Sequence, residues 1–415
     1  MRETTLLAAA ATVSGLLAYV FLSLATRTLG AAATAPVSVL WTYWAASAAV
    51  LTFPIQHWIA RTVATDHGEE SVRRALPKVA MAVVVAAAAA GLGSWFLRAP
   101  LFHREDAAFP ALVALVTVGS GFIGVVRGQL SARHRFHALG WALAGENGVR
   151  CLCAAALAVA GMNAPAAFGL ALALGPLAGI AWPSSFRFSK RGAPSTDESP
   201  LSFLGGVAGG TLLSQFVLTA GPVLLSLMGG SPADVTALFA GLALFRAPFI
   251  VGTALVSQVT GRLTVLVVQG RRDLLRRIRA LLVVGAVGSA ALGAAFGAAA
   301  GPEMVRIIFG AGVRLSPPTA ALIVAGSALA LANLLASVGL IAHARGGAVL
   351  GCWTIACVAG AVPLLADGDV LTRVVVAFVV AESVAFAAMV VDDSRQLRRA
   401  SDADQASPGP MPDAV

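Results

Sequence analysis

Charged residues are scarce in this 415-residue chain: they make up 12% of it, about half their share in a typical soluble domain. Hydrophobic residues make up 58%, and the mean hydropathy is +0.83. So few charges cannot cover a water-exposed surface of this size, and the composition therefore excludes an ordinary soluble protein. The 43 glycines fit a membrane protein, because small residues let helices approach closely in lipid.

Residues that carry catalysis or bind metals are also few and scattered. The four cysteines all fall inside apolar segments, without a disulfide or metal-binding spacing. The six histidines are dispersed along the chain, and no GxxxxGKS or GxxxxGKT phosphate loop is present. Neither of the two longest outer connections carries a pair of catalytic carboxylates. We therefore predict a protein that is not an enzyme, with no catalytic residue, no metal site and no cofactor.

About twelve apolar segments follow one another along the chain, separated by short polar breaks. A bilayer core about 30 Å thick needs roughly 20 apolar residues per helix. The first segment is too long for the apolar region of a secretory signal peptide, so it is predicted to be a span as well. The predicted spans are 5–26, 36–58, 78–98, 108–127, 138–160, 164–184, 202–228, 234–258, 280–300, 316–342, 348–366 and 371–391.

The net charge of +9 would suit nucleic acid, but the positions of the basic residues indicate a membrane topology instead. With the N-terminus in the cytoplasm, 21 of the 29 Lys and Arg residues fall in inner segments and 6 fall in outer ones. Cytoplasmic loops collect positive charge. We therefore expect a multi-pass protein of the cytoplasmic membrane with both termini inside, and no nucleic-acid partner.

A faint internal repeat divides the chain into halves. A long basic loop follows the second span and another follows the eighth, and the turns after spans one and seven correspond at an offset near 200 residues. Six spans in each half make the repeats parallel. The predicted fold is therefore all-α, with two pseudo-symmetric six-helix lobes. The predicted boundaries are 1–185 for the N-terminal lobe, 186–200 for a cytoplasmic linker, 201–391 for the C-terminal lobe and 392–415 for a disordered cytoplasmic tail.

Ionisable residues inside the predicted spans are the candidate site, because each costs at least about 2.5–3.5 kcal/mol on insertion scales. The polar residues in question are Glu146, Asn147 and Arg150 in the fifth span, Arg246 in the eighth and Glu382 in the twelfth. Glu146 and Arg150 are four residues apart and share a helix face. They either pair with each other to hold the bundle or line a water-filled cavity, and both alternatives stay open.

Arginine suits the binding site of an anion, since its planar donors match phosphate oxygens bidentately. Arg246 and Arg150 are therefore predicted to bind an anionic substrate group. Glu146 or Glu382 is predicted to tune that group or to couple it to an ion. Pro248, two residues after Arg246, removes a backbone hydrogen bond and favours a kink in the eighth span.

Three segments resemble the polysaccharide flippases of the Wzx type, within the multidrug/oligosaccharidyl-lipid/polysaccharide exporter superfamily. They are LATRTLG at the end of the first span, RGQLSARHRFHALGWALAGENGVR across the fourth and fifth, and the stretch that begins GPEMVRIIFG. The chain lacks the GxxxYG that often follows the first of these. In this resemblance Arg27 matches the arginine of the RxLG pattern, and Arg246 matches a cavity-facing basic position. Arg27 either extends to the interface or guards the outer mouth of the cavity.

The resemblance implies a flippase that translocates an undecaprenyl-pyrophosphate-linked oligosaccharide, a polysaccharide precursor, across the cytoplasmic membrane by alternating access. Its expected partners are that lipid-linked glycan, membrane lipids, and glycosyltransferases or a polymerase of cell-envelope polysaccharide biosynthesis. Three alternatives stay open: an ion-coupled multidrug antiporter of the same superfamily, an unrelated transporter such as a major facilitator, and a membrane-embedded glycan polymerase or transferase. The short outer connections disfavour the last of these.

Overall fold

The computed structural model describes residues 2–64, 68–188, 208–342 and 346–406. These residues form helices joined by short turns, and no strand occurs among them. The helices of the N-terminal half are α1 (Arg2–Leu29), α2 (Ala31–Ser47), η1 (Ala48–Thr52), α3 (Phe53–Ala64), α4 (Gly68–Phe96), α5 (Arg98–Phe102), α6 (Ala108–Ala132), α7 (Phe136–Val159), α8 (Pro165–Ala173), η2 (Gly175–Ala181) and η3 (Pro183–Phe186). Those of the C-terminal half are α10 (Ala208–Thr219), α11 (Gly221–Leu227), α12 (Pro232–Phe245), α13 (Ala247–Val268), α14 (Arg272–Phe309), α15 (Pro317–Ala342), α16 (Gly346–Ala361), η4 (Val362–Leu365) and α17 (Val370–Ala406).

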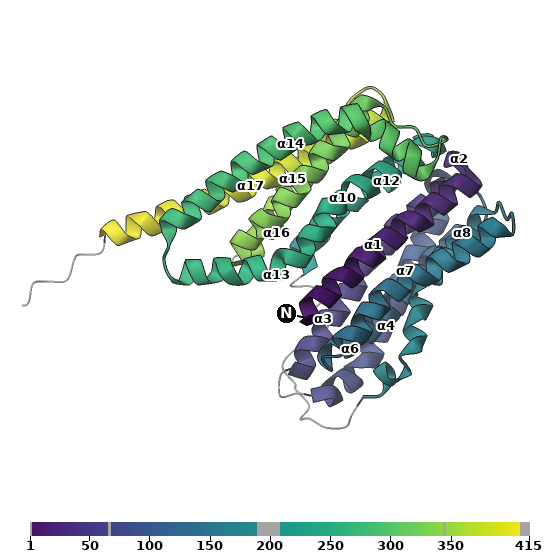
Figure 1. Cartoon of the computed structure of the whole chain (residues 1–415), viewed down its shortest axis with the longest axis horizontal. Helices are drawn as coiled ribbons and strands as arrows, with labels where there is room; N and C mark the ends of the chain where they lie inside the picture. Colours follow the sequence, from purple (N-terminus) through teal and green to yellow (C-terminus); the bar gives the residue numbers. More distant parts are fainter. Residues whose placement is uncertain (1, 65–67, 189–207, 343–345, 407–415) are drawn as a thin grey trace, which may run out of the picture.

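The helices of the two halves form two groups that together make a V (Figure 1). The groups approach each other where α1 ends and α2 begins, and they separate toward the N-terminus. We call the group from α1 to η3 the N-lobe and the group from α10 to α17 the C-lobe. The all-α, two-lobed fold predicted from the sequence is thus confirmed. The predicted linker, 186–200, lies outside the described residues from residue 189 onward.

The same helices pair within each lobe. In the N-lobe, α1 packs on α7, α3 and α4 pack on α6, and α8 and η2 pack on α7. In the C-lobe the equivalent pairs are α10 with α16, α13 and α14 with α15, and α17 with α16. Because the partners occupy the same places in chain order, the halves share one topology, as a parallel repeat requires.

Fewer uninterrupted spans are found than the twelve predicted. Among the described residues, nine helical segments are long and apolar enough to cross a bilayer, and α12 with α13 makes a tenth, bent by 46°. Proline breaks the two remaining segments: α8 gives way to η2 before Pro176, and α10 gives way to α11 before Pro222. Proline has no N–H donor and interrupts a regular helix, so these segments consist of two short helices each. The second begins outside the described residues.

Helix α17 extends further than predicted. It runs to Ala406, whereas disorder was expected from Asp392 onward. Adding residues to an existing helix costs far less than starting a new one, and Asp393 lies 3.8 Å from Arg279 of α14. Both effects continue the helix beyond the apolar segment. The rest of the predicted tail, 407–415, lies outside the described residues.

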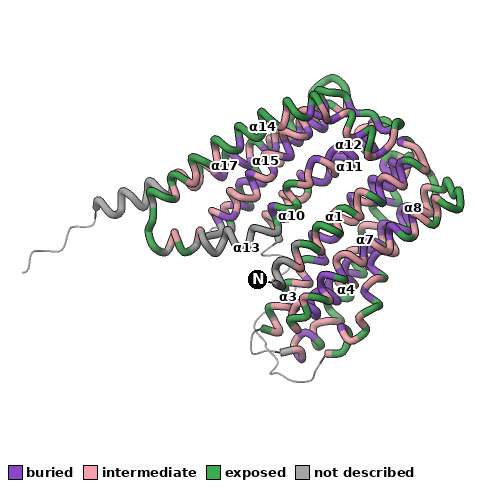
Figure 2. Tube along the Cα trace, viewed as in Figure 1, coloured by how far each residue is buried: buried purple, intermediate pink, exposed green. Residues whose placement is uncertain are grey.

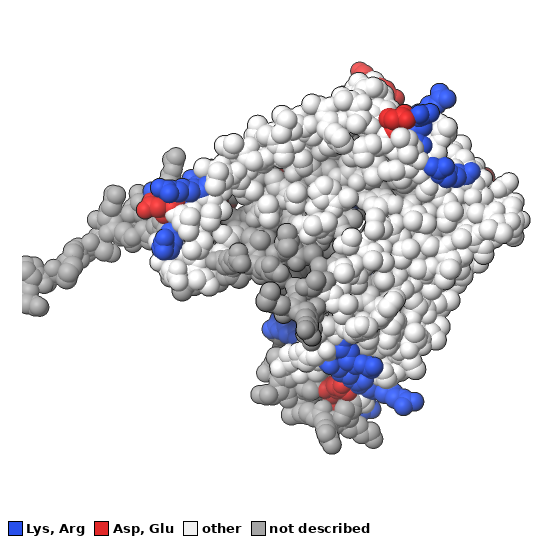
Figure 3. Space-filling view, viewed as in Figure 1, with Lys and Arg blue, Asp and Glu red and all other residues white. Residues whose placement is uncertain are grey.

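The outward faces of both lobes are apolar. Exposed residues follow the helices of both lobes (Figure 2). Large hydrophobic side chains are among the exposed ones, including Leu152 in the N-lobe and Leu292 in the C-lobe, which are 73% and 74% exposed. Figure 3 shows the charged side chains near the ends of the helices, with an uncharged surface between them. An apolar band between charged ends matches the bilayer and its two interfaces. The chain is therefore a multi-pass membrane protein.

Helix α6 contacts its neighbour α3 and the η1 turn at glycines. A Cβ atom added to Gly124 would lie 3.0 Å from the Cα atom of Thr52, and one added to Gly128 would lie 3.0 Å from the Cβ atom of Ile59. Contacts of this length are tighter than nine in ten of those that real Cβ atoms make. Small residues therefore set the spacing of these helices, which is how helices associate in lipid.

We predict that Gly124→Ala destabilises the protein by about 1–3 kcal/mol, the usual cost of overpacking, because Thr52 presents backbone that cannot move aside. Thermal unfolding of the detergent-purified protein measures the effect. The matched control is Gly148→Ala on α7, where an added Cβ meets nothing within 4 Å. Equal unfolding temperatures for the two variants would contradict the close packing of α6.

Candidate functional site

The lobes are joined by hydrogen bonds near the ends of α1 and α14. Ser23 Oγ of α1 donates to the carbonyl of Ile308 at 2.6 Å. Thr236 Oγ1 of α12 donates to the carbonyl of Ala31 at 2.7 Å. We call this set of contacts the inter-lobe joint; it also includes Tyr19 Oη to the Ala243 carbonyl, Ser226 Oγ to the Leu101 carbonyl, and His103 Nε2 with the Gly230 carbonyl. The joint holds one end of the V closed.

Arg27 belongs to this joint. Its side chain is exposed, and it reaches from the last turn of α1 to the last turn of α14, where Nη2 donates to the carbonyl of Ile307 at 2.5 Å. The last carbonyls of a helix have no partner within the helix, so they are available to such a donor. Nε of Arg27 contacts Ser23 Oγ at 3.2 Å. The exposed side chain thus lies between the ends of α1 and α14, and both of its predicted roles, at the membrane interface and at the outer mouth, stay predictions.

Arg246 lies at the bend between α12 and α13, where the kink predicted from Pro248 is found. Its Nε donates to the carbonyl of Leu242 at 2.8 Å, and its Nη1 donates to that of Leu218 at 2.7 Å. Within the described part of the chain it forms no ion pair, and its side chain is half-buried. Tyr19 of the N-lobe reaches the same part of α12, where its Oη donates to the carbonyl of Ala243 at 2.9 Å. This arginine therefore stands at the boundary of the two lobes with its charge uncompensated by a direct carboxylate contact.

Glu382 of α17 is buried beside Asn333 of α15. Asn333 Nδ2 donates to Glu382 Oε2 at 2.7 Å and to its carbonyl at 2.8 Å. Each residue is 1% exposed. The other side-chain oxygens, Glu382 Oε1 and Asn333 Oδ1, are buried without a hydrogen-bond partner. A buried acceptor without a partner is costly in an apolar setting, so the carboxylate of Glu382 is chemically suited to take up a proton or a small cation.

Glu146 is the centre of the buried cluster in the N-lobe. Its carboxylate accepts from Arg127 Nη2 of α6 at 2.5 Å and from Arg150 Nη2 of α7 at 2.6 Å. Trp44 Nε1 of α2 also donates to it, at 3.1 Å. Asn147 donates through Nδ2 to Ser14 Oγ and to the Ser14 carbonyl of α1, each at 2.9 Å. One carboxylate thus ties three helices together.

Arg150 is enclosed on every side in this conformation, with 0% of its surface exposed. Beyond its bond to Glu146, it donates to the Leu172 carbonyl at 3.0 Å and to Asn147 Oδ1 at 2.8 Å. Its guanidinium lies over the ring of Trp44, 4.1 Å from the centroid. A Cβ atom on Gly175 would overlap its Nε. Of the two open alternatives, this geometry favours the structural ion pair over direct contact between Arg150 and a substrate.

The structure therefore divides the predicted residues into three places. Glu146, Asn147 and Arg150 meet inside the N-lobe, Arg246 and Glu382 lie in the C-lobe, and Arg27 lies at the joint. Sequence reasoning missed the three residues that complete the buried clusters, which are Arg127, Trp44 and Asn333.

The arrangement as a whole is that of a two-lobed membrane protein with parallel six-segment halves, joined at one end and carrying buried ionisable groups in each half. Solved MATE transporters of the MOP superfamily share this fold. An inward-facing multidrug resistance MATE transporter aligns with a TM-score of 0.66 at 14% identity, over 96% of both chains. An outward-facing form aligns with a TM-score of 0.59 at 12% identity, again over 96% of both chains.

A third similar structure is a MOP superfamily transporter from Pyrococcus furiosus, described as having a binding pocket of reverse polarity that suggests a different function. It aligns with a TM-score of 0.55 at 14% identity, over 98% of this chain and 99% of that one. Neither the known protein families nor the curated proteins give a match to the chain.

We predict that Glu146→Gln lowers the free energy of unfolding by about 3–5 kcal/mol, the usual cost of removing one partner from a buried ion pair, because two buried guanidiniums lose their counter-charge. Thermal unfolding in detergent measures this loss. The matched control is Glu303→Gln, whose ion pair with Arg306 is exposed on both sides and should have little effect. An unchanged unfolding temperature for Glu146→Gln would show that the cluster does not hold the lobe together.

Proposed function

We propose that the chain is a transporter that translocates an anionic, lipid-linked oligosaccharide across the cytoplasmic membrane by alternating access. The position of Arg246 and its hydrogen bonds are the main support for the proposal. Its guanidinium is half-buried at a bend on the lobe boundary, and it is bound to carbonyl oxygens rather than to a carboxylate. A guanidinium held in this way keeps its charge for an anion and matches a pyrophosphate bidentately.

The charge pattern supports a direction for the pathway. Basic residues concentrate at the end where the N-terminus lies, which the positive-inside rule assigns to the cytoplasm. The inter-lobe joint is then at the outer side, and the V opens inward. The higher TM-score with the inward-facing MATE structure, 0.66 against 0.59, agrees with this orientation. Rocking of the lobes about a central site would expose the site to each side in turn.

The proposed substrate class is one that cannot cross a bilayer unaided. The polar head of a lipid-linked sugar would lose its water in the hydrocarbon core, at a prohibitive cost. A charged path between the lobes would accept that head while the lipid tail stays in the membrane. In this scheme Arg246 binds the pyrophosphate, Arg27 contributes at the outer mouth, and Arg150 with Glu146 and Asn147 keeps the N-lobe rigid. Membrane glycosyltransferases would supply the substrate, and a polymerase would use it.

A second candidate is an ion-coupled multidrug antiporter, which the structural similarities fit equally well. The buried carboxylate of Glu382, with its unpartnered oxygen beside Asn333, favours coupling to a proton or cation in either case. A coupling group of this kind changes its occupancy as the lobes rock, and the gradient then sets the direction of transport.

We predict that Arg246→Ala abolishes glycan export while membrane abundance stays normal, because the anion loses its fixed counter-charge. In a strain that lacks the native gene, surface polysaccharide disappears and lipid-linked precursor accumulates. Arg246→Lys keeps the charge without the planar fork and should retain partial export. The control is Arg314→Ala, an exposed arginine in an outer connection. Normal surface polysaccharide with Arg246→Ala would reject the proposal, and a loss of drug resistance instead would favour the antiporter.

We predict that Glu382→Gln lowers gradient-driven transport in proteoliposomes by roughly tenfold or more, within the ordinary range of coupling free energies. The amide keeps the shape of the side chain but cannot exchange a proton or neutralise a cation. Substrate binding without a gradient should be preserved. Glu303→Gln, at an exposed position, serves as the control. Full gradient-driven transport by Glu382→Gln would exclude this carboxylate as the coupling group.

A further inference from the structure

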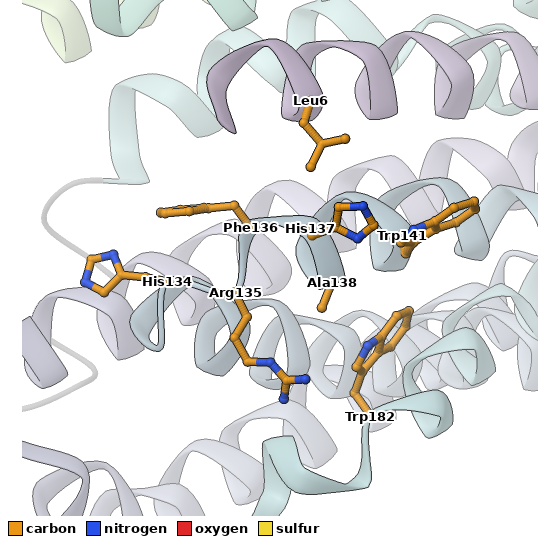
Figure 4. Close-up of a pocket in the computed structure, with 8 residues that line it drawn as sticks. All are labelled: Leu6, His134, Arg135, Phe136, His137, Ala138, Trp141 and Trp182. Atoms are coloured by element: carbon orange, nitrogen blue, oxygen red, sulfur yellow. The ribbon is translucent and has the colours of Figure 1, made fainter. Parts of the chain in front are cut away.

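A cavity of about 710 Å³ opens on the N-lobe where α7 begins. Its lining converges from three separate parts of the chain: Leu6 of α1, the stretch 134–141, and Trp182 after η2 (Figure 4). None of these residues belongs to the inter-lobe joint or to the buried clusters. The proposed transport mechanism therefore gives this cavity no role.

One part of the lining is basic. His134, Arg135 and His137 are exposed, and none of them forms an ion pair with a described carboxylate. The neighbouring Arg133 differs, because its Nε lies 2.9 Å from Glu69 of α4. The positive charge at Arg135 is thus left for a ligand, whereas that of Arg133 is already neutralised.

The other part of the lining is aromatic. Trp141 follows Arg135 by six residues on α7, which places it about 9 Å further along the helix axis at 1.5 Å per residue. Trp141 is 62% exposed, and Trp182, which directly follows η2, lines the same cavity (Figure 4). Tryptophan concentrates at the level where headgroups meet acyl chains. The lining therefore changes from basic at the helix end to aromatic toward the apolar centre.

We propose that this cavity binds a membrane lipid through its phosphate headgroup. The phosphate pairs with Arg135 at the basic end of the cavity, and the hydrocarbon chain lies along Trp141, Trp182 and Leu6. A soluble phosphate would leave the aromatic wall in water, and an uncharged apolar molecule would leave Arg135 without a counter-ion. A phosphate joined to a hydrocarbon chain fits both parts. Basic pockets between helices at the cytoplasmic side bind anionic headgroups for the same reason.

The test is native mass spectrometry of the full-length protein in detergent, titrated with phosphatidylglycerol or with a diacylglycerol of the same acyl chains. We expect a phosphatidylglycerol adduct and a much weaker diacylglycerol adduct. The double variant Arg135→Gln, His137→Gln should bind phosphatidylglycerol at least fivefold more weakly, since each Lys or Arg near an anionic surface contributes roughly that factor. The control is Arg271→Gln, an exposed arginine at the start of α14 that does not line the cavity.

Two results would overturn the proposal: equal weakening by the double variant and the Arg271→Gln control, or equal binding of the two lipids. Trp141→Ala gives an independent check of the aromatic wall, and it should weaken the adduct without altering the unfolding temperature. Competition with undecaprenyl phosphate then identifies the source of the phosphate. Displacement assigns the cavity to a prenyl phosphate, and no displacement assigns it to the phospholipid. Because these experiments measure lipid binding, their result tests the lipid site independently of whether the protein exports a glycan.

Discussion

An ionisable side chain inside a bilayer must find its partner within the protein, and this constraint organises both lobes. Glu146 accepts hydrogen bonds from two guanidiniums and an indole, and these bonds connect α2, α6 and α7. Arg246 instead donates hydrogen bonds to backbone carbonyls in a region where the helix is bent. The first solution encloses its charges and makes a rigid lobe. The second leaves a positive charge at the boundary where the lobes meet, and the proposed function depends on this difference.

The fold was predictable because its strongest determinant, runs of apolar residues long enough to span a bilayer, is local in the sequence. The runs at 108–127 and 316–342 correspond to α6 and α15, and the proline after Arg246 marked the bend of the eighth span. Proline also accounts for the main difference between the predicted spans and the helices. At Pro176 and Pro222 the apolar run continues while the regular helix does not, so counting hydrophobic residues overestimates the number of unbroken spans.

The candidate site was predictable only where its partners are close in sequence. The spacing of Glu146 and Arg150 along one helix gave their contact correctly. Arg127 stood at the end of a predicted span and resembled an ordinary cytoplasmic charge, yet it turns inward to the same carboxylate from another helix. Asn333 and Trp44 are uncharged and lie within apolar runs, so nothing local distinguishes them from packing residues. Pairing across helices depends on how the helices face each other, which the sequence of a single helix does not encode.

The inter-lobe joint is built from side-chain donors on one lobe and main-chain acceptors on the other. Ser23 and Arg27 donate to the carbonyls of Ile308 and Ile307, and Thr236 donates to that of Ala31. A carbonyl keeps its hydrogen-bonding capacity whatever side chain its residue bears, so these acceptor positions are free to drift in evolution as long as the helix ends stay in place. A neutral bond of this kind contributes only about 1 kcal/mol, because water replaces the lost partner, and a bond from a charged donor such as Arg27 contributes about 1.5–3 kcal/mol. The hydrogen bonds of the joint are therefore individually replaceable, while apolar packing between α2 and α12, where the rings of Trp41 and Phe239 lie 6.0 Å apart, holds the same end together independently of any one of them.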